Sequence, residues 1–250
     1  MELTENQISV ILNVYKRPHM LEKQIQALKN QSVPISSENI HVWYNKSDVA
    51  QLYPIDDKIN VYVCNYNTKF WGRFTLPMLI RTPYVAMFDD DIIPQKNWLK
   101  NCLETIEKPE TNGILGGSGV IIHGRGYVPH NKFGWNGSHS NKVERVDLVG
   151  HAWFFRQEWA KYMWYEKPYT WDNGEDIMFA YLAQKFGGVN TFVPPHPEDD
   201  KSLWSADYNI AETVGSDINA SWRLGNHLDL RGEVCVHCIN NGWKTVNKIK

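Results

Sequence analysis

Three consecutive carboxylates are the first candidates for chemistry in this sequence. The acids at residues 89–91 directly follow Tyr84–Phe88, an apolar run with the residue types of a buried strand. Open α/β sheets bind ligands beyond the carboxyl ends of their strands, where these acids are expected to lie. A hard divalent cation carrying a phosphate would relieve the repulsion between them. The alternative is a solvated acidic turn that caps the next helix.

A second acidic pair, Glu175 and Asp176, precedes a run with several apolar residues and is expected to open a helix. Acids in a first helical turn are common, because the helix dipole and the free N–H groups favour them. The functional interpretation is a carboxylate on the floor of a cleft, able to act on a sugar hydroxyl or on a developing cation.

Several basic residues are candidates for contacts to a phosphate. Lys16 and Arg17 follow the expected strand Ile8–Val14, at the sheet edge where a diphosphate would bind, although such side chains are often simply solvated. Arg73 can reach a base or phosphate, or it can be a surface charge on a helix. Arg223, near an expected helix start at residues 220–224, is a further candidate phosphate contact.

The elements that must position these groups alternate in type. Strands are expected at Ile8–Val14, at Ile40–Tyr44 and at residues 59–64, with a helix at residues 20–30 between the first two. This alternation predicts a parallel sheet with crossover connections. After the acids we expect further elements in this order: a helix at Trp98–Ile106, a strand and turn at 113–122, a long loop over the cleft at 123–141, a strand at 143–155, the helix that Glu175 opens, a short strand at 192–197 and an irregular polar stretch at 198–219.

Composition bounds the class of protein. The chain of 250 residues, 42% apolar and 22% charged, is typical of a soluble globular protein, and its net charge of -2 gives no reason to expect nucleic acid. No signal peptide or membrane span is visible, which predicts a cytoplasmic protein. Cys235 and Cys238 lack a second pair of ligands, so buried free thiols are favoured over a zinc site. The 11 tryptophans suit the apolar faces of sugars.

The order of these motifs resembles the GT-A fold glycosyltransferases, and most of all the exostosin-like family of N-acetylhexosaminyltransferases. The resemblance implies an α/β fold with a mixed, mostly parallel central sheet flanked by helices. It also implies one domain over residues 1–250, with a nucleotide-binding half (1–95) and an acceptor-binding half (96–250). The motifs that carry it are Val14-Tyr15-Lys16-Arg17, Val42-Trp43-Tyr44-Asn45, Asn67 with Arg73, Asp89-Asp90-Asp91, Leu148-Val149-Gly150-His151-Ala152-Trp153-Phe154-Phe155, Asn173-Gly174-Glu175-Asp176-Ile177 and Arg223.

The resemblance implies a role for each acid. Asp91 would ligate Mn²⁺ or Mg²⁺ bridging the diphosphate of a nucleotide sugar, with a UDP-sugar expected. Asp90 would hold the ribose and Asp89 the donor sugar. Asp176 would be the carboxylate near the anomeric carbon, with Glu175 beside it.

The remaining roles belong to the donor. By the same resemblance, Arg17 and Asn45 would contact the nucleotide, with Asn67 nearby in the same group. Arg73 would contact the nucleotide or the donor sugar, and Arg223 the phosphates. The partners implied are a nucleotide sugar and a glycan or other hydroxyl acceptor.

Stereochemistry and rival functions stay open at this stage. The resemblance favours retention of configuration, whereas an inverting enzyme would need Asp176 or Glu175 as general base. A nucleotidyltransferase would want a Gly-rich basic loop after the first strand, which Tyr15-Lys16-Arg17-Pro18 does not match. An inactive carbohydrate-binding protein on the same scaffold is the third possibility.

Overall fold

The computed structural model describes residues 7–49, 55–218, 220–223 and 225–249; the polar residues 1–6, Asn219 and Leu224 lie outside the described residues. The strands are β1 (Ile8–Val14), β2 (Ile40–Tyr44), β3 (Asn60–Val63), β4 (Tyr84–Phe88), β5 (Ile114–Ile122), β6 (His130–Phe133), β7 (Glu144–Val146), β8 (Leu148–Arg156) and β9 (Thr191–Val193). The α-helices are α1 (Leu21–Lys29), α2 (Trp98–Ile106), α3 (Glu175–Gly187), α4 (Tyr208–Gly215) and α5 (His227–Asn240). Shorter 3₁₀ helices lie at Pro18–Met20, Ser37–Asn39, Gly72–Met78, Pro109–Thr111, Gln157–Trp164, Lys201–Leu203 and Ser221–Arg223.

The first half of the sheet is parallel, as the alternating pattern predicted. β1 pairs in parallel with β2 and with β4, and β2 pairs in parallel with β3. β1 and β4 are buried almost throughout, which explains their continuous apolar sequences. Because the three parallel strands β1, β2 and β4 end at one edge, the residues that follow them meet there.

The second half of the sheet is largely antiparallel. β8 runs antiparallel to β4 and to β5, while β9 is parallel to β5, so the whole sheet has the order β3-β2-β1-β4-β8-β5-β9-β7 with β6 beside β5. This confirms the expected mixed sheet. The pairing of Phe88 with Ala152 brings the start of β8 alongside the end of β4. His151 therefore arrives next to the acidic turn.

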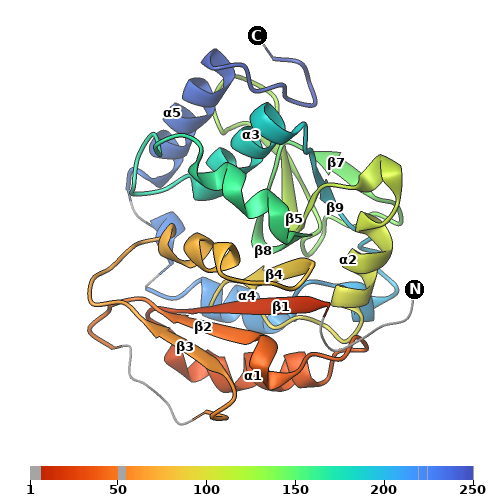
Figure 1. Cartoon of the computed structure of the whole chain (residues 1–250). Coiled ribbons are helices and arrows are strands. Elements are labelled where there is room, and N and C mark those ends of the chain that lie inside the picture. Colours follow the sequence, from red (N-terminus) through yellow and green to blue (C-terminus); the bar gives the residue numbers. More distant parts are fainter. Residues whose placement is uncertain (1–6, 50–54, 219, 224, 250) are drawn as a thin grey trace.

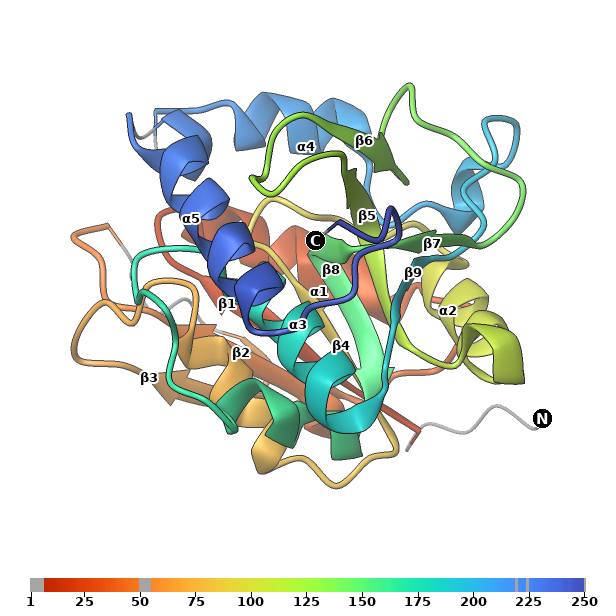
Figure 2. The same cartoon turned by 90° about the horizontal axis from the view of Figure 1, so that it is seen from above.

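The helices cover the sheet and position the site. α1 lies below β1 to β3 in Figure 1 and buries Leu21, Ile25 and Leu28, which share one helical face. α3 and α5 lie side by side in both views (Figures 1 and 2), and in Figure 1 they are at the end of the molecule opposite to α1. Gly174, with φ of +81°, precedes α3, and a Cβ there would lie 2.9 Å from Val234 of α5. This close packing fixes the start of α3.

Two expectations about the strands are wrong. The expected strand at 143–155 divides into β7 and β8 at Asp147, whose carboxylate accepts the amides of Ile122 (2.9 Å) and Val246 (2.6 Å). The strand-and-turn expected at 113–122 is one long strand, β5, and its glycines let the backbone of that strand pack closely: a Cβ on Gly116 would lie 2.2 Å from Val149.

Three irregular stretches also differ from expectation. The loop at 123–141 contains β6, and the stretch at 198–219 contains α4, which Asp207 caps by accepting the amide of Asn209. Arg73, considered above as a possible surface charge on a helix, lies in the 3₁₀ helix Gly72–Met78, which has Pro77 inside it. None of the helices in the described ranges is both long and apolar enough to cross a membrane. Cys102, Cys235 and Cys238 are buried free thiols, as expected.

Candidate active site

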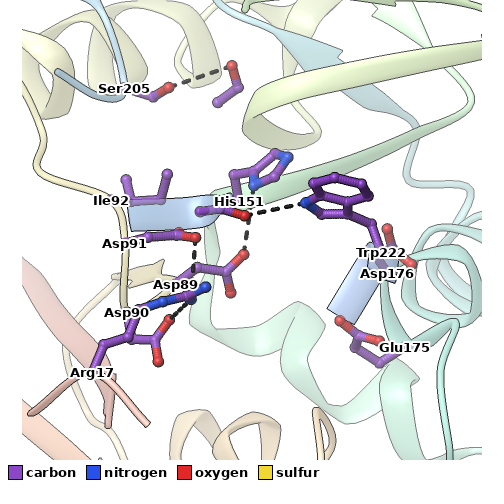
Figure 3. Close-up of polar contacts among 12 residues, drawn as sticks. Arg17, Asp89, Asp90, Asp91, Ile92, His151, Glu175, Asp176, Ser205 and Trp222 are labelled. Atoms are coloured by element: carbon purple, nitrogen blue, oxygen red, sulfur yellow. Dashed lines mark hydrogen bonds and ion pairs between the residues drawn. The ribbon is translucent and has the colours of Figure 1, made fainter. Parts of the chain in front are cut away.

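The acidic turn after β4 is anchored from two neighbouring elements. The Gln24 amide of α1 donates to the carbonyl oxygens of Asp89 (2.8 Å) and Ile92 (2.9 Å). The backbone amide of Asp89 donates to the carbonyl of His151 at 2.9 Å. These bonds hold three carboxylates in a fixed arrangement at the sheet edge, where Figure 3 shows them beside Arg17 and His151.

Arg17 supplies the positive charge nearest to the turn. Its Nη1 donates to Asp90 at 2.7 Å and to Asp91 at 3.3 Å, while Nε and Nη2 donate to Asp217 at 3.1 and 3.0 Å. Burial would lower the pKa of Arg17, but the Asp217 hydrogen bond and the two neighbouring acids raise it, so the guanidinium stays charged. Asp90 is buried, and its desolvation raises its pKa in spite of Arg17.

One carboxylate oxygen of Asp91 is available to bind a ligand. Its Oδ1 is buried and has no hydrogen-bond partner among the described residues. Burial, followed by the charges of Asp89 and Asp90, raises the pKa of Asp91 to about 7. Asp89, Asp91 and His151 each offer one ligand atom, and these atoms lie within 4.8 Å of one another. This group is suited to a metal ion.

His151 occupies an unusual backbone conformation in this group. Its φ is +65°, which is uncommon for a residue other than glycine and is often found at functional sites. Its Nδ1 lies 3.8 Å from Asp89 Oδ2. Burial, and then the charge of Lys132, lowers the pKa of His151 to about 4. The imidazole is therefore neutral at physiological pH, as a metal ligand must be.

Arg73 links the acidic turn to the start of α3. Its side chain is buried, forms an ion pair with Asp89, and lies 3.6 Å from Glu175. Its guanidinium also lies 4.9 Å from the centre of the Trp153 ring. Arg73 is thus a fixed cation inside the cleft, not a surface charge.

The acidic pair at the start of α3 has two different environments. Asp176 accepts two hydrogen bonds from Arg231 of α5, at 3.0 and 2.7 Å, in a buried ion pair. Glu175 is buried as well, and its Oε2 has no partner among the described residues. Burial and the charge of Asp176 raise the pKa of Glu175 to about 8. Glu175 therefore keeps its proton to a much higher pH than a solvated glutamate does.

The other predicted donor contacts come from two separate segments that line the cleft. Asn45 Nδ2 donates to Asn67 at 2.8 Å, and Asn45 Oδ1 accepts the backbone amide of Thr68 at 2.8 Å, so the end of β2 is tied to the loop that follows β3. Arg223 is exposed and donates to the Ser216 carbonyl at 2.7 Å.

All ten predicted site residues line one cleft of about 1040 Å³, which is large enough for a nucleotide sugar together with an acceptor. The acidic turn and the start of α3 lie on opposite sides of it (Figure 3). The cleft also contains residues that sequence reasoning did not select, namely His151, Lys132 and Arg231. Arg231 had a detectable signal, because it precedes Val234, Cys235 and Cys238 at helical spacing and so belongs to a buried helix face.

Several solved structures are similar to this chain in fold. S. aureus TarS shares 17% identity with a TM-score of 0.50, and the match covers 76% of this chain and 36% of that one. TarS residues 1–349 give 18% identity and a TM-score of 0.48, covering 76% and 60%. The mannosyltransferase PcManGT from Pyrobaculum calidifontis, in complex with GDP-Man and Mn²⁺, gives 14% and 0.47, covering 76% and 55%. This chain thus spans less than two thirds of each.

At such identities the likeness concerns the fold, and it agrees with the expected mixed α/β arrangement of GT-A glycosyltransferases. A comparison with curated proteins gives no significant match. The narrower exostosin-like resemblance stays a prediction. The family model for glycosyl transferase family 2 matches residues 9–164, which is more than half of the chain, and the chain belongs to that family.

Proposed function

We propose that this protein transfers a sugar from a nucleotide diphospho-sugar to a hydroxyl group of an acceptor, with the help of Mn²⁺ or Mg²⁺. The observation that carries the proposal is the placement of two acidic groups across one cleft. One is the potential metal group of Asp89, Asp91 and His151, and the other is the pair Glu175 and Asp176.

The residues present fit a divalent metal. Two carboxylates and a neutral imidazole would form the ligand set, and the buried Oδ1 of Asp91, which has no partner among the described residues, would bind the cation. Asp89, which the sequence resemblance placed on the donor sugar, belongs to this set together with Asp91. Binding must displace the proton that Asp91 holds at acidic pH, so metal affinity should rise as pH increases through about 7.

The donor would lie across the end of the parallel strands. Asn45, Asn67 and Arg17 line the nucleotide side of the cleft, and residues 1–95 contribute all of them. UDP is our proposed nucleotide, from the sequence resemblance. Arg223, which donates to the Ser216 carbonyl, would turn from it to the phosphates.

The chemistry requires charge stabilisation on both sides of the broken bond. The metal, when bound, would stabilise the negative charge that develops on the departing diphosphate. Arg17 and Arg73 supply further positive charge near the acidic turn, in a buried site where electrostatic interactions are strong. On the opposite wall, Glu175 and Asp176 would face the cation-like sugar and the incoming acceptor.

The geometry favours inversion over the retention that the sequence resemblance favoured. A retaining transfer needs no protein base if the departing phosphate takes the acceptor proton, whereas an inverting one does. Among the described residues, Glu175 Oε2 has no hydrogen-bond partner, and the pKa of about 8 makes the ionised fraction of Glu175 a strong base, which grows as pH rises toward 8. Asp176, paired with Arg231, would orient the start of α3 and stabilise the sugar cation.

The first test is a thermal-shift screen of UDP, GDP, CMP and dTDP and their sugars, with and without Mn²⁺. A ligand at a hundred times its Kd adds about 2.7 kcal/mol of stability, which corresponds to roughly 5–10 °C in a protein of this size. Asp91→Asn should abolish the Mn²⁺-dependent shift, and Asp57→Asn, in an exposed loop, should keep it. An undiminished shift in Asp91→Asn would refute the metal assignment.

The second test is transfer itself. With the donor known, NMR of the first product formed reports its anomeric configuration, and Glu175→Gln should bind donor normally while losing transfer. A retained configuration would restore the resemblance-based mechanism. A nucleotide-dependent shift with neither transfer nor donor hydrolysis would favour an inactive binding protein.

A further inference from the structure

Lys132 lies in the part of the cleft that β6 contributes. It lies on β6, an edge strand that pairs with β5, where it faces Val120 in the register. His130 lies two residues earlier on the same strand and so shares its face. Lys132, His130 and Val120 all line the cleft. This part of the cleft therefore combines basic and apolar side chains, in contrast to the acidic turn.

A stack of rings holds the Lys132 side chain near the reaction centre. The Lys132 ammonium lies 4.5 Å from the centre of the Trp135 ring, and that ring lies 4.6 Å from the ring of His151. Trp135 is fixed further by an edge contact with Tyr208 at 4.6 Å. The ammonium is thus held within about two ring spacings of the potential metal group, a distance that one sugar unit can bridge.

The Lys132 ammonium lacks an anionic partner. Within the described residues it makes no hydrogen bond and no ion pair, and Glu212 acts on it only at longer range. Burial lowers the pKa of Lys132, which shows that its surroundings disfavour the charge. A cation–π contact offsets only part of the free-energy cost of burying a charge. An anion from a ligand would supply the missing stabilisation.

The strand order indicates which substrate would bring that anion. Arg17 and Asn45 follow β1 and β2, on one side of β4, whereas Lys132 lies on β6, reached from β4 only through β8 and β5. The nucleotide diphosphate is expected on the first side. The group that reaches Lys132 should therefore belong to the acceptor.

We propose that Lys132, positioned by Trp135, forms an acceptor subsite for a sugar that carries a phosphate or carboxylate group. The inference rests on the proposed glycosyl transfer, because that reaction defines which ligand is the acceptor. Binding of an anion at Lys132 can nevertheless be measured without turnover. The anionic group of the acceptor would lie on the sugar unit that is glycosylated or on the next one.

Matched ligands test the subsite. Isothermal titration compares a panel of neutral oligosaccharides with the same skeletons bearing a uronate or a 6-phosphate, using protein with and without Mn²⁺ and UDP. We expect at least one charged class to bind about tenfold more tightly than its neutral partner, with an affinity that falls as salt rises. The uronate and phosphate arms separate the two sources of charge. If no charged ligand exceeds its neutral partner, the subsite is wrong.

Variants assign the effect to Lys132. Lys132→Gln should remove the tenfold preference and Lys132→Arg should retain most of it, while Lys142→Gln, an exposed lysine, should change nothing. Glu212→Gln should leave the preference intact or increase it. A preference that survives in Lys132→Gln would overturn the assignment. If Lys132→Gln loses the preference but keeps the Mn²⁺–UDP thermal shift, its fold and donor site are intact. If the unaltered protein shows no such shift, that result counts against the proposed function and not against the subsite.

Discussion

Removal of Arg231 should expose how strongly the active-site acids depend on buried cations. Arg231 and Asp176 are 7% and 8% exposed, and two hydrogen bonds of 3.0 and 2.7 Å join them. Deleting one partner of a buried pair leaves an uncompensated charge and costs about 3–5 kcal/mol. Arg231→Met should therefore lower the melting temperature by roughly 6–20 °C, at about 2–4 °C per kcal/mol for this chain length.

A double-mutant cycle separates this coupling from lost packing. Arg231→Met, Asp176→Asn and the double variant are compared by urea unfolding, and we expect a coupling free energy of about 2–3 kcal/mol. The control is the pair Lys185 and Glu166, whose side chains are 32% and 31% exposed. Lys185→Met should cost less than about 1 kcal/mol. Additive effects of Arg231→Met and Asp176→Asn would refute the argument that each charge is stable only because the other is present.

Three further predictions concern neighbouring features. Gly215→Ala should weaken Mn²⁺ binding in a metal titration, because its Cβ would lie 2.9 Å from Asp91 Oδ2, while stability changes by less than about 1 kcal/mol. The free energy of unfolding should fall by about 1–2 kcal/mol as pH rises from 6.5 to 8. The reason is that Glu175 keeps its proton in the folded protein up to a pKa of about 8, whereas the unfolded chain has already released it. Glu175→Gln should therefore reduce this dependence on pH. Gly72→Ala should cost about 1–3 kcal/mol in urea unfolding, because the new Cβ would lie 2.2 Å from Thr68 Oγ1.

The parts of the fold that sequence predicted well are those with a strong periodic signal. The strands Ile8–Val14, Ile40–Tyr44 and Tyr84–Phe88 and the helix Trp98–Ile106 have the expected bounds. Their apolar residues are continuous or helically spaced, and turn residues bound them. Because the buried strand ends at Phe88, the acidic turn could be placed at the sheet edge from the sequence alone, and the location of the candidate site followed from it.

The elements that sequence reasoning missed have mixed signals. α5 carries Gly232 and the charged Arg231 on a helix that is otherwise partly apolar, and α4 is short and begins in a polar stretch. Residues distant in the chain complete the site: Arg17 meets Asp217 across 200 positions, and Asp176 meets Arg231 across 55. A single sequence has no local signal for such pairs, because they form only when separate elements pack together.

Among the described residues, two buried carboxylate oxygens of the cleft have no hydrogen-bond partner. Arg17, Arg73 and Arg231 each contact one or two of the acids in the cleft, which keeps a dense cluster of negative charge compatible with folding. This neutralisation stops short of Asp91 Oδ1 and Glu175 Oε2, both buried. Buried acceptors of this kind are costly unless a ligand completes them. A cation at Asp91 and an acceptor hydroxyl at Glu175 would do so, on opposite walls of one cleft, and the bond to be broken would lie between them.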